Sequence, residues 1–88
     1  MSNKIFVIAG NYDQFNTFRK TLIRTMVEED IPLHYQDIIY VEKDRMYGYN
    51  DVWGYKVGTW NQRSDIEEIC NMLLTRFSSI DEFIEVEL

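Results

Sequence analysis

The sequence predicts an α/β fold for this chain, and three observations support that prediction. Two segments, residues 4–29 and 54–77, share one pattern: an apolar run, a turn with glycine, and then apolar residues at helical spacing. The first run is apolar without alternation, which is typical of a parallel strand buried on both faces. The chain has 88 residues, of which 45% are hydrophobic, enough for one domain with a modest core. We therefore expect residues 1–88 to form a single, small, Rossmann-like domain of three layers.

The first unit begins with a predicted strand over residues 4–9, followed by a turn at Gly10 and Asn11. The spacing then predicts a helix over residues 12–29. Its apolar face carries Phe15, Phe18, Leu22 and Met26. Its opposite face carries Arg19, Lys20 and Arg24, and is either solvated or in contact with an acidic surface, including the C-terminal segment of another copy. Three acids at residues 28–30 oppose the helix dipole, so we expect this end to fray.

The middle of the chain holds two more β-prone runs, over residues 37–41 and 54–59. Between them, residues 42–53 predict an irregular loop with a helical turn at residues 44–47.

The second helix is predicted over residues 65–77, because Ser64 and Glu67 form a capping-box pattern ahead of an apolar face. Residues 83–87 alternate for part of their length, so we allow for a fourth strand there at the sheet edge. The first three strands are expected to form a mainly parallel sheet in the order 2-1-3, with the helices on opposite faces. Right-handed crossovers make this the simplest arrangement.

This topology brings the carboxyl ends of the strands to one edge, where ligands gather in open α/β sheets. The candidate ligand-binding residues there are Gly10, Asn11, Tyr12, Arg45, Thr59, Trp60 and Arg63. Gly10 and Asn11 precede a helix whose backbone N–H groups could bind an anion. The phosphate-binding patterns G-x-G-x-x-G and Walker A are absent, however, and an ordinary turn explains these two residues as well. Trp60 could stack on a base or seal the sheet end. Arg63 could bind a phosphate or pair with Asp65 or Glu67.

A second set of candidates points to a protein partner. Aromatic residues crowd the loop over residues 42–53, where they either pack onto the domain or are buried in a partner; aromatics with arginine are typical of interface hot spots. The net charge of −6 lies wholly in residues 64–88, because residues 1–63 hold eight acids and eight bases. This acidic segment is either a solvated face or a surface for a basic partner, and it disfavours direct binding to nucleic acid. The candidate partner-binding residues are Tyr47, Tyr49, Trp53, Glu82 and Glu85.

Several classes of function find no support in the residues. The single cysteine, Cys70, allows no internal disulfide and argues against a thiolate zinc site, so we expect a reducing cytoplasm. The single histidine, His34, has no neighbouring nucleophile–acid arrangement, and we assign no catalytic residue, metal ligand or cofactor. No apolar run reaches the roughly 20 residues of a membrane span, and we expect no contact with a membrane.

Two sets of short motifs resemble small proteins of unassigned function encoded by tailed bacteriophages. The first set is Tyr40-Val41, Arg45 and Gly48; the second is Val57-Gly58-Thr59-Trp60, Arg63, Asp65-Ile66 and Ile69. Those proteins also begin with a strand like Ile5–Gly10, and the similarity covers roughly residues 4–70. It does not extend to residues 42–53 as a whole or to the acidic segment after Ser78. The resemblance implies a phage product that acts in the host cytoplasm, and it assigns no activity.

These observations favour a non-enzymatic interaction protein that binds and modulates a host protein, and leave homodimerisation open. The alternative is a domain that binds a nucleotide or phosphate ligand at the strand ends, including a reduced enzyme of Rossmann-like type. A third hypothesis is an acidic mimic of DNA.

Overall fold

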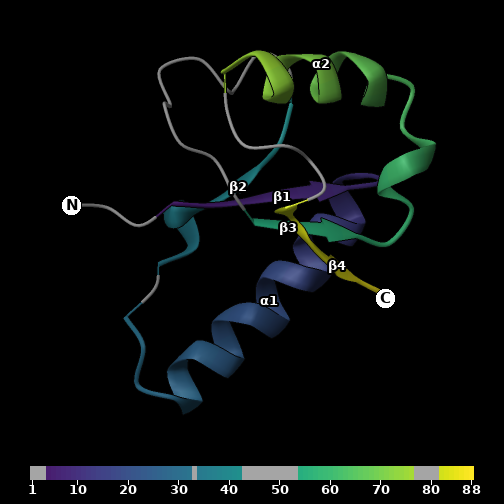
Figure 1. The fold of residues 1–88 in the computed structure, drawn as a ribbon. Helices are drawn as coiled ribbons and strands as arrows, with labels where there is room; N and C mark the ends of the chain where they lie inside the picture. The colour runs from purple at the N-terminus through teal and green to yellow at the C-terminus, as the bar shows by residue number, and fades with distance from the viewer. Residues whose placement is uncertain (1–3, 33, 43–53, 77–81) are drawn as a thin grey trace.

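The computed structural model describes residues 4–32, 34–42, 54–76 and 82–88. Its helices and strands follow the order β1 (Ile5–Ala9), α1 (Tyr12–Glu28), β2 (Ile38–Tyr40), β3 (Gly54–Val57), α2 (Ile66–Arg76) and β4 (Ile84–Val86), as labelled in Figure 1. Two short 3-10 helices complete the described part, η1 (Tyr35–Asp37) before β2 and η3 (Trp60–Gln62) after β3.

The four strands form one fully parallel sheet in the order β2-β1-β3-β4. The α/β class and the 2-1-3 order are therefore confirmed, and the fourth strand does pair with β3 at the edge. β1 lies at the centre, with Phe6 opposite Ile39 on one side and opposite Gly54 on the other. Gly54 is required there, because a Cβ on this residue would overlap the carbonyl oxygen of Phe6.

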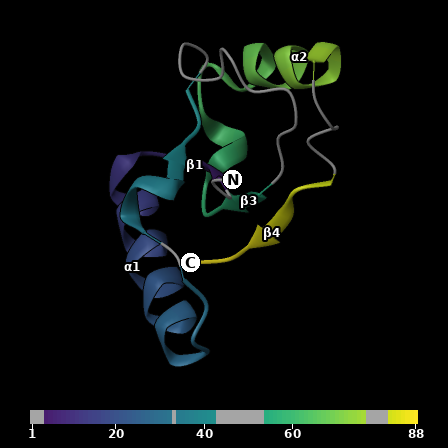
Figure 2. The same cartoon turned by 90° about the vertical axis from the view of Figure 1, so that its left-hand side faces the viewer.

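The helices cover opposite faces of the sheet, which makes three layers (Figures 1 and 2). Alternate residues of β1 point into the two hydrophobic cores, one on each face of the sheet. Ile5, Val7 and Ala9 pack with Phe15, Phe18 and Leu22 of α1. On the other face, Phe6 and Ile8 pack with Val41, Ile69 and Phe83. A strand with two buried faces needs the unbroken apolar run seen in the sequence.

The helix bounds agree with the predicted bounds to within a residue. Asn11 caps α1, since its Oδ1 accepts from the backbone N–H of Gln14 at 2.9 Å. At the other end of α1, where the sequence predicts fraying, the structure shows a closed helix end. The N–H of Ile31 donates to Met26 O at 2.9 Å and that of Asp30 donates to Val27 O at 3.2 Å, which is a Schellman closure with Asp30 at φ 57°.

Two short segments differ from the predictions. The third β-prone run ends at Val57 rather than at residue 59, because the chain turns at Gly58 and Thr59 into η3. η1 precedes β2 and was not predicted. The predicted loop over 42–53, with its helical turn at 44–47, lies outside the described residues apart from Glu42. Within the described ranges, no helix is long and apolar enough to cross a membrane.

Candidate functional site

The carboxyl edge of the sheet brings together most of the residues that the sequence assigned to a ligand. Gly10, Asn11 and Tyr12 follow β1, and Thr59, Trp60 and Arg63 follow β3. The strands are parallel neighbours, so both turns lie at the same end of the sheet. Arg45 lies outside the described residues.

The side chain of Gln14 occupies the space between these two turns. Its Oε1 accepts from the backbone N–H groups of Gly10 and Thr59, each at 3.0 Å, and its Nε2 donates to Thr59 Oγ1 at 2.9 Å. A Cβ on Gly10 would collide with the same threonine hydroxyl, which explains the glycine. Backbone N–H groups that could have faced a phosphate oxygen therefore already donate to an amide oxygen of the chain.

Arg63 joins the ends of two strands to the start of α2. Its Nε and Nη2 donate to the two carboxylate oxygens of Asp65, both at 2.9 Å. Its Nη1 donates to Val41 O at 2.7 Å and to Ala9 O at 3.3 Å. The Arg63 side chain is only 7% exposed. Of the two interpretations offered by the sequence, this geometry corresponds to the pairing with Asp65.

Trp60 is partly buried and packs against the core on the α2 side of the sheet. The Nζ of Lys56, a buried residue of β3, lies 5.0 Å from the centre of the Trp60 ring. This contact gives the lysine charge a partner in a cation–π interaction. The arrangement matches the interpretation in which Trp60 covers the end of the sheet.

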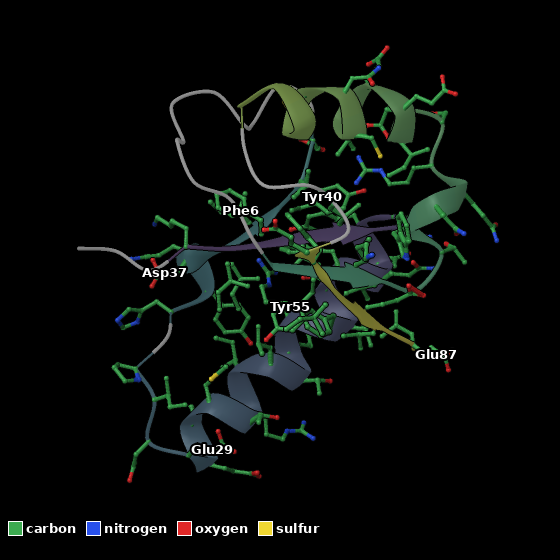
Figure 3. All side chains as sticks on the ribbon, viewed as in Figure 1. Phe6, Glu29, Asp37, Tyr40, Tyr55 and Glu87 are labelled. Carbon is green, nitrogen blue, oxygen red and sulfur yellow. The ribbon has the colours of Figure 1, made fainter. Side chains whose placement is uncertain are left out.

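A different group of residues forms a hollow between α1, η1 and β2, which we call the tyrosine–arginine pocket. Its volume is about 230 Å³. It is lined by Tyr12, Phe15, Arg19, Tyr35, Gln36, Ile38, Ile39 and Tyr40. In Figure 3 the labelled Asp37 lies directly before β2 and the labelled Tyr40 at its end, and this strand lines the pocket.

Arg19 is the charged residue among those lining the pocket. Its guanidinium carbon lies 4.9 Å from the Phe15 ring centre and 5.0 Å from the Tyr35 ring centre. Nη2 donates to Asn16 Oδ1. The Nε–H is buried and has no acceptor among the described residues. A buried donor without an acceptor costs about 1–3 kcal/mol, and this one is closed off from solvent.

Aromatic rings continue from Arg19 to the carboxyl edge. Phe15 and Tyr40 have ring centres 5.2 Å apart, and Tyr12 meets Tyr40 edge-on at 5.7 Å. The Arg63 guanidinium lies 5.0 Å from the Tyr40 ring. Tyr12 and Tyr35 nevertheless remain 53% and 50% exposed. The pocket therefore combines the packed rings of Phe15 and Tyr40 with two tyrosines, Tyr12 and Tyr35, that remain accessible to solvent.

An ion pair anchors η1, which carries two of the lining residues. Lys4 Nζ lies 3.1 Å from Asp37 Oδ1 and ties η1 to the residue before β1. The hydrogen bond from Lys4 holds the pKa of Asp37 below its usual value. Burial acts in the opposite direction but is the weaker effect.

Sequence reasoning found only Tyr12 of this pocket. It assigned Arg19 to a basic helix face, either solvated or in contact with an acidic surface, because Lys20 and Arg24 are also basic. One signal was available: Tyr12, Phe15 and Arg19 follow one another at helical spacings of three and four residues, which places them on one face of α1. The contribution of Tyr35 could not be read from the sequence, because η1 was not predicted.

The candidate partner-binding residues are only partly placed. Tyr47, Tyr49 and Trp53 lie outside the described residues. Glu82 and Glu85 are exposed beside and on β4, at the sheet edge opposite β2. They are therefore remote from the tyrosine–arginine pocket.

Across residues 4–32, 34–42, 54–76 and 82–88, no three His, Cys, Asp or Glu residues cluster as metal ligands would. Comparisons with protein-family models, with curated proteins and with solved structures find no match to this chain.

Proposed function

We propose that this chain is a small, non-enzymatic interaction protein that binds a partner protein through the tyrosine–arginine pocket. The observation that carries the proposal is Arg19, whose guanidinium lies against the Phe15 and Tyr35 rings in the lining of a pocket open to solvent. Arginine and tyrosine are, with tryptophan, the residue types enriched at binding hot spots, and here both are held by ring contacts before any partner arrives.

The size of the pocket supports a side chain of a protein rather than a cofactor as the bound group. Its volume of about 230 Å³ is below the roughly 300–1,000 Å³ of small-molecule sites. The resemblance to phage proteins extends the proposal: the partner is then a host protein, bound and modulated in the host cytoplasm.

The two alternative functions have less support. A nucleotide or phosphate ligand at the strand ends would have to displace Gln14 from Gly10 and Thr59, and Arg63 from Asp65. DNA mimicry would use the exposed acids Glu82 and Glu85, for which no contact or spacing indicates a bound enzyme.

Affinity capture from a lysate of the host tests the proposal with matched variants. Tagged wild-type protein, Arg19→Gln and Tyr35→Ala are compared with Arg24→Gln, which removes an exposed charge from the same helix. We expect one partner to be retained by the wild type and by Arg24→Gln, and its recovery to fall at least about tenfold for the two pocket variants. Equal recovery by all four proteins would rule out the pocket as the recognition surface.

A further inference from the structure

The outer edge of β2 lies beside the tyrosine–arginine pocket and carries no strand within the described part of the chain. Its three residues, Ile38 to Tyr40, include neither a charge nor a proline. The opposite edge strand, β4, has Glu85 at its centre and Glu87 directly after it. Charges on an edge strand discourage pairing with another chain, so of these two three-residue edge strands β2 is the one without such a charge.

The direction of the backbone groups follows from one hydrogen bond. The N–H of Val41 donates to Val7 O at 2.9 Å, so Val41 faces β1. Backbone groups alternate along a strand, and Tyr40 therefore directs its N–H and C=O away from β1. The C=O of Ile38 points the same way, whereas its N–H already donates to Tyr35 O. Within the described part of the chain, one donor and two acceptors on the outer edge of β2 thus have no partner.

The pocket supplies a charge next to this edge. Arg19 lies on α1, on the face of the sheet toward which Ile38 and Tyr40 pack. Alternate side chains of any strand added beside β2 would point to that same face. The group that best satisfies a guanidinium is a carboxylate, because a charge-assisted hydrogen bond is about twice as strong as a neutral one.

We propose that an extended segment of the partner protein pairs with the outer edge of β2 and places an Asp or Glu side chain on Arg19. The backbone of β2 supplies register without sequence preference, and Arg19 with Tyr12 and Tyr35 selects the acidic residue. This inference rests on the proposed function, since it names the chemistry of the partner at the same pocket.

Short blocked peptides test the inference without knowledge of the partner. The first probe is acetyl-Thr-Val-Glu-Val-Thr-amide. The second has Gln in place of Glu, and the third carries N-methyl groups on alternate peptide nitrogens. Sodium acetate serves as the bare carboxylate. Each is titrated into ¹⁵N-labelled protein while the Arg19 Nε–H and the Tyr40 backbone N–H are followed by NMR, with the exposed Arg24 Nε–H as internal control.

We expect the Glu peptide to shift the Arg19 and Tyr40 signals saturably while the Arg24 signal changes little. The Gln peptide should bind at least about tenfold more weakly, as should the N-methylated peptide. Arg19→Gln should abolish the difference between the Glu and Gln peptides, and Arg24→Gln should preserve it.

Two results would overturn the inference. Equal affinity of the Glu and Gln peptides would show that Arg19 does not select a carboxylate. An Arg19 shift with acetate, without a Tyr40 shift with any peptide, would show that no strand pairs with the edge of β2. If either occurs while capture of the partner still depends on Arg19, the inference fails and the proposed function stands. Loss of that dependence as well would overturn both.

Discussion

Replacement of Arg63 by alanine should destabilise the fold rather than remove a ligand. The guanidinium donates to two backbone carbonyl oxygens, Ala9 O and Val41 O, and forms a two-point ion pair with Asp65. An acceptor left without a donor in a buried place costs about 1–3 kcal/mol. The Asp65 side chain is 29% exposed, so the ion pair itself adds little, about 0.5 kcal/mol.

We therefore expect Arg63→Ala to lower the free energy of unfolding by about 3 kcal/mol. For a domain of this size, each 1 kcal/mol shifts Tm by about 4–8 °C, so Tm should fall by at least about 12 °C. Urea unfolding followed by circular dichroism measures the difference. Asp65→Asn, which keeps the shape and removes the charge, should cost about 1 kcal/mol.

The control is Arg24→Ala, which removes an exposed arginine and should change stability by less than about 0.5 kcal/mol. If Arg63→Ala also changed the free energy of unfolding by less than about 0.5 kcal/mol, the structural role of Arg63 would be refuted. If such a variant also lost a thermal shift that nucleotides give to the wild type, the alternative with a ligand at the strand ends would gain the support that it lacks here.

Three further changes test other parts of the fold. Asp30→Gly should raise the free energy of unfolding by about 0.5–1 kcal/mol, because residue 30 has φ 57° and glycine adopts this conformation without strain; a loss of stability in urea unfolding would contradict the Schellman closure. Gly54→Ala should destabilise by more than about 2 kcal/mol or prevent folding, since the added Cβ meets the backbone of Phe6; near-native stability would show that β1 and β3 pack differently. The lowered pKa of Asp37 stabilises the fold only where the carboxylate is ionised: the contribution is complete above the unfolded-state pKa of about 3.9 and is lost as pH falls through the lower folded-state pKa. The difference in stability between wild type and Asp37→Asn should therefore shrink when the pH is lowered from 6 to 3. A difference that does not change with pH would show that the ion pair with Lys4 contributes nothing to stability.

The sequence predicted the elements whose pattern is repeated over several residues. The unbroken apolar run of β1 and the helical spacing of Phe15, Phe18 and Leu22 set the centre of the sheet and the buried face of α1. Right-handed crossovers then fixed the strand order. These features depend on periodicity and chirality, which a sequence displays directly.

The candidate site was harder to predict because it depends on single contacts between distant segments. Gln14 reaches Thr59 across 45 positions and so fills the space that a phosphate would need. Arg19 looked like one of several solvated bases until η1 placed Tyr35 against it. Neither contact leaves a periodic signal. The ambiguity at Arg63 was visible in the sequence, but only the position of Asp65 decided between its two interpretations.

The central claim is that Arg19 serves recognition and not stability, and Arg19→Met tests it most directly. Methionine keeps much of the side-chain bulk against Phe15 and Tyr35, and removes the buried Nε–H that lacks an acceptor. The two cation–π contacts that are lost are worth about 0.5–1 kcal/mol each, which the removed desolvation penalty of about 1–3 kcal/mol offsets. We predict that the free energy of unfolding in urea stays within about 1 kcal/mol of wild type or rises. A loss of more than about 2 kcal/mol would show that Arg19 holds the fold together, and would contradict its assignment to partner binding.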